Sequence, residues 1–200
     1  MIWDNVAGIY DIFANLYNGK VHEVLCKKIN SMITNQDIIL ECACGTGMLS
    51  LGVAQRCKKL IATDISKNML KKARKKCKAY KNAEFCEGDI LRLNYPDKSF
   101  TKVIAANVIH LLDDPYKALK ELERVCSVKG KIIIPTYMNG KASDKKRGLA
   151  NLLGKKGSIF KIEFTYDSYR QFFFDAGYKN TEYSLIEGRV PCAVAVITRE

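Results

Sequence analysis

The 200-residue sequence contains no long hydrophobic run. A helix that crosses a bilayer needs roughly 18 or more consecutive apolar residues, and no segment approaches that length. Residues 1–13 carry an early acid, no basic stretch and no continuous apolar core, unlike a secretion signal. These absences lead us to expect a cytoplasmic protein.

The eight cysteines lack the pairing that metal sites need. No C-x-x-C pair occurs, and the closest two, Cys42 and Cys44, are separated by a single alanine. Zinc-ligand spacing is therefore absent, and we expect no metal. Free cysteines are among the most often buried residues, so we expect most of these in the core. Soft-metal or arsenic chemistry is a minor alternative that would require three thiols to converge.

Acidic residues are scarcer than basic ones, and the formal net charge is +12. The basic residues gather at 67–81 and 141–156. Solvated helix faces are one explanation, and attraction to phospholipid headgroups, nucleotides or RNA is another. The sequence has no recognisable RNA-binding module and no basic stripe rich in aromatics, so nucleic acid is an unlikely partner.

Apolar periodicity predicts strands that alternate with helices. Helices are predicted at 9–33, with a break near Asn18–Gly19, and at Leu49–Cys57, Lys67–Cys77, Pro115–Cys126 and Thr165–Ala176. Strands are predicted at Ile38–Glu41, Leu60–Asp64, Ala83–Cys86, Val103–Ala106, Lys131–Pro135, Glu182–Ile186 and Ala193–Thr198. This alternation indicates an α/β fold with a parallel, doubly wound sheet in a single domain.

A glycine-bearing turn follows the first predicted strand, in the segment 38–50 (IILECACGTGMLS). Glu41 ends the strand, and Ala43, Gly45 and Gly47 follow at alternate positions. The third glycine of a dinucleotide fingerprint and the lysine of a P-loop are both missing. The spacing E-x-A-x-G-x-G therefore favours an adenosine-type ligand without pyrophosphate, whose positive amine meets the acid. A plain strand–turn–helix with packing glycines is the alternative.

Three acids end three successive strands, namely Glu41, Asp64 and Asp89. Ligands of open α/β sheets bind beyond the carboxyl ends of the strands, so these acids should converge on one crevice. Glu41 can meet the amino-acid end of a cofactor, and Asp64 can accept hydrogen bonds from both ribose hydroxyls. Asp89 can accept from the adenine amino group, while Ile65 and Ile90 sandwich the ring.

At this point the chain resembles the class I S-adenosylmethionine-dependent methyltransferases, in the ubiquinone/menaquinone-biosynthesis-like (type 11) group. ECACGTG resembles the first motif of that family, ATDIS the second acidic motif and EGDI the adenine motif. The stretch FTKVIAANVIHLLDDPYKALKELERVCSVKGKIIIP resembles its fourth-to-fifth-strand region. Glu41 and Ala43 depart from the Asp and Gly that many members carry. We also assign Cys42 and Met69 to the cofactor site.

The resemblance implies a Rossmann-like, seven-stranded sheet, mostly parallel with an antiparallel last strand. It also implies N-terminal helices and a lid insertion. We divide the single methyltransferase domain, 1–200, into an N-terminal helical lid, a cofactor-binding core, a lid insertion, and a C-terminal helix with a strand pair, at 1–34, 35–135, 136–165 and 166–200. S-adenosyl-L-methionine is the implied cofactor, with S-adenosyl-L-homocysteine as product, and a monomer or homodimer is expected.

The resemblance also implies further contacts to the cofactor. Tyr10 and Tyr17, in the N-terminal lid, would lie near it, although core aromatics at helical spacing would look the same. Asn107 and Val108 would lie at the end of the fourth strand, under the methyl group. His110 is our candidate for a base or acceptor contact, with a structural histidine as the alternative.

Methyl transfer from a sulfonium is an in-line displacement, so the protein mainly supplies alignment and desolvation. His22 is a weaker candidate base, and Tyr137 and Tyr166 are candidates for the acceptor side. No N-P-P-Y-type run follows the fourth strand, which disfavours amide or nucleobase N-methylation of that kind.

The methyl acceptor is expected to be a small molecule. The basic segment 141–156, with Leu149, Leu152 and Leu153, would suit an amphipathic helix on an anionic membrane and hence a lipid or quinone acceptor. A surface lid over a soluble acceptor explains it equally well. A non-catalytic S-adenosylmethionine-binding protein and an NAD-dependent oxidoreductase are the remaining alternatives, and the missing third glycine and Glu41 count against the latter.

Overall fold

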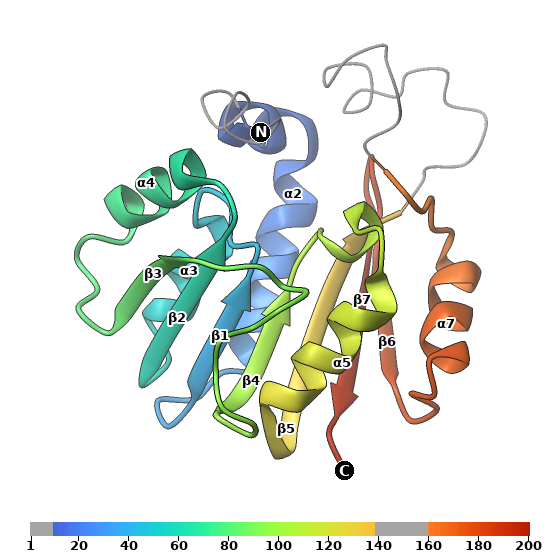
Figure 1. Ribbon diagram of the computed structural model, residues 1–200. Helices are drawn as coiled ribbons and strands as arrows, with labels where there is room; N and C mark the ends of the chain where they lie inside the picture. The colour runs from blue at the N-terminus through green and yellow to red at the C-terminus, as the bar shows by residue number, and fades with distance from the viewer. Residues whose placement is uncertain (1–9, 139–159) are drawn as a thin grey trace.

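The computed structural model describes residues 10–138 and 160–200, with side chains from residue 18 onward. The described residues form a seven-stranded sheet in the order β3-β2-β1-β4-β5-β7-β6 (Figure 1). The strands are β1 (Ile38–Cys42), β2 (Lys59–Asp64), β3 (Ala83–Glu87), β4 (Phe100–Ala105), β5 (Cys126–Tyr137), β6 (Glu182–Ile186) and β7 (Cys192–Thr198). Only β7 runs antiparallel to the others. The predicted Rossmann-like sheet is therefore confirmed.

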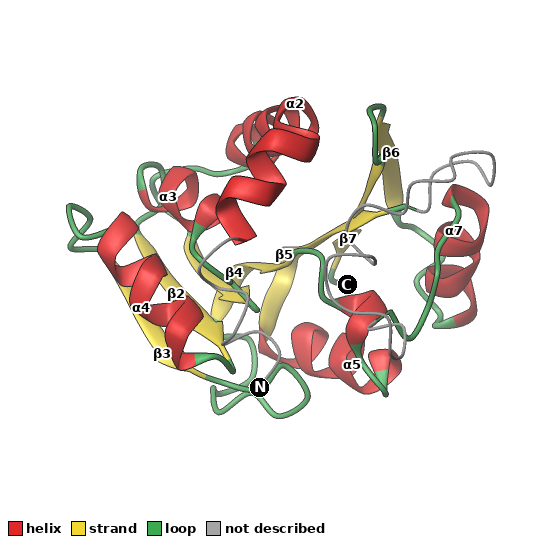
Figure 2. Ribbon diagram, turned by 90° about the horizontal axis from the view of Figure 1, so that it is seen from above, coloured by secondary structure: helices red, strands yellow, loops and turns green. Residues whose placement is uncertain are grey.

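Helices cover both faces of this sheet (Figure 2). They are α2 (Tyr10–Ser31), α3 (Met48–Ala54), α4 (Lys67–Lys76), α5 (Pro115–Val125) and α7 (Tyr166–Asp175), with a 3₁₀ turn at Ile109–Leu111. Successive side chains of a strand point to opposite faces of the sheet, so the core lies in two halves. Ile39 of β1 packs with side chains of α2, α3 and α4 on one face. Leu40 points to the opposite face, into the cluster that contains side chains of α5 and α7.

Several elements differ in their bounds from the sequence-based prediction: α3 ends at Ala54 rather than Cys57, and β4 begins at Phe100 rather than Val103. The helix predicted at Pro115–Cys126 ends at Val125, because Cys126 turns to an extended backbone and pairs with Phe100 of β4. Strand β5 is therefore longer than predicted and begins at Cys126. The break predicted near residues 18–19 is present as a kink, because Asn18 has non-helical dihedral angles.

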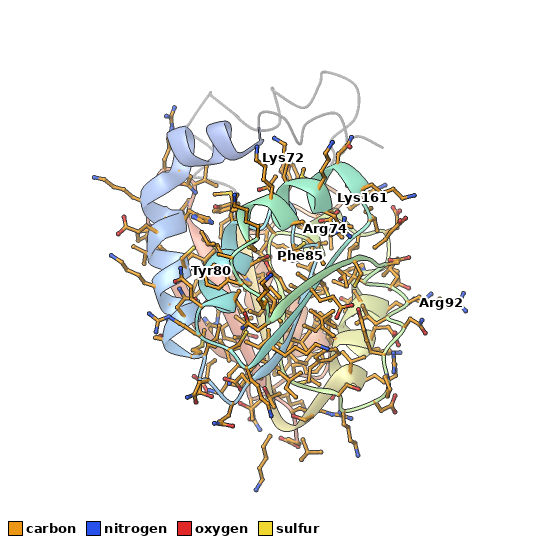
Figure 3. The ribbon with its side chains drawn as sticks, turned by 90° about the vertical axis from the view of Figure 1, so that its left-hand side faces the viewer. Lys72, Arg74, Tyr80, Phe85, Arg92 and Lys161 are labelled. Atoms are coloured by element: carbon orange, nitrogen blue, oxygen red, sulfur yellow. The ribbon has the colours of Figure 1, made fainter. Side chains whose placement is uncertain are left out.

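The edge strand β3 is partly protected by the helix that precedes it. The guanidinium of Arg74, on α4, donates a hydrogen bond of 2.7 Å to the backbone carbonyl oxygen of Phe85. Figure 3 labels both residues. An edge strand exposes unpaired backbone groups that invite pairing with another chain. Arg74 therefore occupies one of these groups in β3.

A half-buried polar cluster ties together the amino ends of β1 and β4. Burial raises the pKa of the Asp37 carboxyl, but hydrogen bonds from Lys102, Thr34 and Thr101 lower it below its usual value overall. The Asp37 and Lys102 side chains are 7% and 13% exposed. Breaking a buried pair leaves an uncompensated charge, so this contact anchors the sheet at the end opposite the candidate site.

We predict that Lys102→Ala lowers the free energy of unfolding by about 3 kcal/mol, because Asp37 then keeps a buried charge with no cation beside it. Urea unfolding of both proteins measures the difference. Lys120→Ala, at an exposed position of α5, is the control and should change stability by less than about 0.5 kcal/mol. Equal effects of the two substitutions would contradict the structural role of Lys102.

Candidate functional site

A cavity of about 220 Å³ opens at the carboxyl ends of the central strands. It lies where the strand order reverses between β1 and β4, which is the usual ligand position in open α/β sheets. It is lined by His22, Leu25, Glu41, Ala43, Cys44, Gly45, Thr46, Met48, Leu49, Asp64, Ile65, Met69, Ala106, Asn107, Val108, Leu111, Leu112 and Tyr137. Side chains of α2, β1, β2 and the segments after β4 and β5 therefore meet in one space.

The turn between β1 and α3 takes left-handed backbone conformations at three alternate residues. Ala43, Gly45 and Gly47 have φ of 53°, 55° and 77°. A Cβ added at Gly45 would meet no atom within 4 Å, so that position is open to the cavity. One added at Gly47 would approach Cα of Ala73, in α4, at 3.0 Å. Gly45 therefore allows a ligand to approach the backbone, whereas Gly47 allows close packing of α3 against α4.

Asp64 joins this turn to the next one. Its Oδ2 accepts a hydrogen bond of 2.8 Å from the backbone N–H of Gly45, and its Oδ1 accepts one of 2.8 Å from the N–H of Ser66. The Ser66 hydroxyl in turn caps α4 by accepting from the N–H of Met69. Asp64 also lines the cavity, so the protein orients this carboxylate at a position that ligand hydroxyls could reach.

Glu41 is a buried carboxyl at the edge of the cavity. Glu41 is only 2% exposed, and its Oε2 accepts a hydrogen bond of 2.6 Å from the hydroxyl of Ser50, on α3. Burial raises its pKa to about 7; the Ser50 hydrogen bond opposes that rise and the charge of Asp64 adds to it. A ligand with a positive amine would remove this penalty by compensating the carboxylate. The geometry therefore fits the amino-acid end of a cationic cofactor.

The cavity brings together eight of the predicted site residues: Glu41, Ala43, Gly45, Asp64, Ile65, Met69, Asn107 and Val108. Ile65 is 41% exposed, which leaves an apolar surface for a ring. The other predicted residues with described side chains do not line it: Cys42, Gly47, Asp89, Ile90 and His110. Tyr10 and Tyr17 belong to α2, and their side chains lie outside the described part of the chain.

Cys42, Asp89 and Ile90 face elsewhere for identifiable reasons. Cys42 alternates away from Glu41 along β1 and joins the core on the side of α5 and α7. Ile90 packs into that same core. Asp89 is exposed and accepts a hydrogen bond from the N–H of Leu91. The adenine contacts assigned to Asp89 and Ile90 therefore remain predictions.

His110 is buried beside the cavity rather than on its wall. Its ring stacks on Phe160 with 5.1 Å between centroids. Burial lowers its pKa to about 4, so it is neutral near pH 7. Its Nδ1 has no hydrogen-bond partner within the described residues. The assignment of His110 as a base remains a prediction, and the role would require the acceptor to reach a ring that does not line the cavity.

Several lining residues were not assigned to the site from the sequence. Leu25, Cys44, Thr46, Met48, Leu49, Ala106, Leu111 and Leu112 line the cavity, as do His22 and Tyr137, which the sequence offered only as weaker candidates. His22 and Leu25 are three residues apart in the sequence, a spacing that places both on one face of α2. Sequence analysis can use this spacing once it is known which face of α2 meets the cavity. Tyr166, the other tyrosine considered, is not a lining residue and packs at the core under Arg170.

The charged and sulfur-bearing groups around the site set further limits. Across residues 10–138 and 160–200, no group of three or more His, Cys, Asp or Glu side chains is arranged to hold a metal ion. Burial raises the pKa of the Cys42 thiol to about 12 and raises that of Cys44 further.

In the same described ranges, no helix has the length and apolarity needed to cross a membrane. The basic segment 141–156 lies outside them.

A family model described as a methyltransferase domain (Methyltransf_11) matches residues 40–134. This range contains both acids of the cavity, the glycine turn and strands β2 to β4, together with most of β5.

Curated relatives extend the similarity over most of the chain. The protein named ubiquinone/menaquinone biosynthesis C-methyltransferase UbiE of Rickettsia bellii (strain OSU 85-389) is 28% identical over 217 residues, covering 94% of this chain and 88% of that protein. The protein of the same name in Rickettsia akari (strain Hartford) is 32% identical over 71% of this chain and 61% of its own length. In this second match the chain spans less than two thirds of its relative.

Solved structures share the fold. Magnesium protoporphyrin IX methyltransferase of Synechocystis PCC 6803, determined with bound S-adenosylhomocysteine, matches with a TM-score of 0.68 at 17% identity. The match covers 91% of this chain and 83% of that chain.

We predict that the ligand-free protein loses stability as pH rises from about 4.5 to about 7. In this window the folded state keeps the Glu41 proton that the unfolded chain has released, and the pKa rise from 4.5 to about 7 corresponds to about 3 kcal/mol. Urea unfolding across this range measures it. In Glu41→Gln the same curve should be flatter; an equally steep fall would contradict the buried carboxyl as its source.

We predict that Ala43→Gly raises the free energy of unfolding by about 0.5 to 1 kcal/mol, because glycine takes the left-handed conformation without the Cβ penalty that alanine pays. Thermal and urea unfolding are the measurements. Ala106→Gly, at a cavity residue without a positive φ, is the matched control and should lower stability. Destabilisation by Ala43→Gly to the same extent would show that no strain is stored there.

Proposed function

The chain belongs to the class I S-adenosylmethionine-dependent methyltransferases, and from this premise we propose that it methylates a small-molecule acceptor held beside Asn107 and Tyr137. S-adenosylmethionine is the cofactor. One observation supports this position for the cofactor: Glu41 and Asp64 line the same cavity as the open backbone at Gly45. This arrangement suits a ligand that carries an ammonium group and ribose hydroxyls but no phosphate.

The residues fit that cofactor in three respects. The buried Glu41 carboxyl, whose pKa burial raises to about 7, would ionise beside the ammonium group. Asp64 lies at the cavity in a position fixed by Gly45 and Ser66, where its carboxylate would accept from the ribose hydroxyls. Ile65 and Met69 offer apolar surface for the adenine ring.

When bound, S-adenosylmethionine supplies a methyl group already activated on a cationic sulfur. The chain's own residues have to align the acceptor and exclude water from it. Val108, Leu111 and Leu112 line the cavity after β4 and would exclude water there. Burial lowers the pKa of His110 to about 4, so near pH 7 it would be a neutral imidazole with one ring N–H.

A lipid or quinone acceptor at a membrane surface is the second candidate. The curated relatives are named for ubiquinone and menaquinone biosynthesis, and the cavity wall after β4 is apolar. The proposed membrane contact through 141–156 concerns residues outside the described ranges. A methyl-transfer screen across amines, phenols, quinols, thiols and phospholipids separates the two acceptor classes. Sedimentation with anionic vesicles at low salt tests the membrane contact, and an absence of binding would remove it.

We predict that Asp64→Asn weakens S-adenosylhomocysteine binding by about 10- to 100-fold, the scale of one or two lost hydrogen bonds to a charged group. The amide cannot accept from both Gly45 and Ser66 as the carboxylate does. Calorimetric titration measures the affinity. Asp113→Asn, at a carboxylate 84% exposed, is the control and should leave it unchanged.

Unchanged affinity in Asp64→Asn would contradict the ribose contact. Binding of neither S-adenosylmethionine nor S-adenosylhomocysteine by the wild-type protein, or preferential binding of NAD, would overturn the proposed function as a whole.

A further inference from the structure

The segment that contains α4 concentrates the positive charge of the chain. Residues 67–81 (KNMLKKARKKCKAYK) contain eight lysines and arginines and no acid, while the formal net charge of the whole sequence is +12. Lys67, Lys71 and Lys75 are exposed and follow one another at intervals of four residues, which places them on one face of α4 along roughly 12 Å. Lys78, also exposed, comes just after the end of the helix. We call these four residues the lysine row.

The protein itself compensates little of the charge in the lysine row. Lys67 has an oxygen of Glu87 at 3.6 Å from its Nζ. In the described part of the chain, no carboxylate oxygen lies within 4.0 Å of Nζ of Lys71, Lys75 or Lys78. Like charges four residues apart weaken a helix, and cations in the first turn oppose the helix dipole. The lysine row therefore destabilises α4 in the isolated protein, and anions lying against it would remove that penalty.

The other face of α4 packs on the protein and leaves the helix no exposed apolar anchor. Met69, Leu70 and Ala73 are the buried residues of α4. The large apolar side chains that are exposed within the described residues all lie outside α4. A partner of the lysine row would therefore be held by charge alone, and its binding would weaken steeply as salt is added.

Helix α4 borders the cavity of the candidate site. Met69, near its start, lines the cavity, as does Thr46 of the glycine turn. Nζ of Lys76, at its end, donates a hydrogen bond of 3.5 Å to the Thr46 hydroxyl. The helix lies on the side of the molecule that Figure 3 turns toward the viewer. A surface bound along the lysine row would therefore lie close to the cavity.

The composition of this face favours a lipid surface over a nucleic acid. Sites for single-stranded nucleic acids combine positive charge with aromatic side chains on which bases stack, and arginines contribute to that stacking. Here the guanidinium of Arg74 donates to the carbonyl oxygen of Phe85, and the hydroxyl of the half-buried Tyr80 accepts from Gln55. Clusters of four to eight lysines or arginines on an amphipathic helix are typical of binding to acidic phospholipids.

We propose that the lysine row of α4 binds the surface of an anionic phospholipid membrane and thereby holds the cavity beside the lipid headgroups. The phosphate groups of the lipid supply the negative charge that the protein does not place along this row. The inference goes beyond the proposed function, because the contact needs neither cofactor nor methyl acceptor. It is also separate from the contact considered for residues 141–156, since it rests on α4 and the residue that follows it.

Sedimentation of the protein with vesicles tests the proposal. Vesicles of phosphatidylcholine mixed with phosphatidylglycerol are compared with vesicles of phosphatidylcholine alone. We expect binding to the mixed vesicles only, at about 0.1 M salt, and release at about 1 M salt, where the screening length falls from about 10 Å to about 3 Å. Absence of binding to the mixed vesicles, or binding that persists at the higher salt concentration, would overturn the proposal.

A variant with Lys71→Gln, Lys75→Gln and Lys78→Gln removes three charges of the row. It should bind the mixed vesicles about 100-fold more weakly, at about fivefold for each charge near the surface. Glutamine is a good helix former, so α4 should persist, and far-ultraviolet circular dichroism checks this. Arginine at the same three positions keeps the charges and should retain binding. Loss of binding with arginine as well would contradict a contact made by charge alone.

The matched control removes three charges elsewhere, with Lys117→Gln, Lys120→Gln and Lys179→Gln. These exposed residues lie on α5 and after α7, whose side chains pack on the other face of the sheet from α4. The control should bind the mixed vesicles within about threefold of the wild-type protein, because charges farther from the lipid than the screening length contribute little. Equal weakening by the two glutamine variants would assign the binding to net charge and overturn the proposal.

Polyuridylate, added at the same phosphate concentration as the anionic lipid, separates a membrane partner from RNA. We expect most of the protein to remain on the mixed vesicles. Complete displacement by polyuridylate would show that the lysine row prefers a nucleic acid, and would overturn the choice of a lipid surface.

Discussion

The carboxylate of Asp64 is the contact on which the geometry of the site depends. Its two oxygens accept from the N–H groups of Gly45 and Ser66, so one side chain fixes the turn after β1 and the start of α4. The same carboxylate lines the cavity. The protein therefore uses its proposed ribose contact to hold the loop against which the cofactor lies, and binding needs little rearrangement of that wall.

A second constraint is the burial of acids in a strongly basic chain. Glu41 and Asp64 lie at the same cavity, and the pKa of Glu41 is raised to about 7 by burial in the first place and by Asp64 in addition. Such an arrangement costs stability in the absence of a cation and offers a gain when a cation binds. A neutral nucleoside with a positively charged tail meets this electrostatic pattern, whereas a pyrophosphate would meet two carboxylates. The wall beyond β4 supplies complementary features: apolar side chains and Asn107, whose Oδ1 accepts a hydrogen bond from the N–H of Tyr137.

Much of this architecture was predictable from the sequence, because it depends on local patterns. Alternating apolar runs predicted all seven strands, and the acids that end β1 and β2 predicted two sides of the cavity. The features that the sequence did not predict depend on contacts between residues far apart in the chain. No local signal places His22 and Leu25 of α2 over the cavity, since that depends on how the helix packs across the sheet. The orientation of the Asn107 amide depends on Tyr137, thirty residues away.

The central claim is that a cationic S-adenosylmethionine binds with its ammonium group beside Glu41. Calorimetric titration of S-adenosylmethionine near pH 7, repeated in buffers of different ionisation heat, tests it most directly. The account predicts one site per chain and release of part of a proton, because binding ionises a carboxyl whose pKa burial has raised to about 7. Glu41→Gln should bind more weakly and lose that proton release. Absence of binding heat, or identical affinity and proton release in Glu41→Gln, would contradict the account.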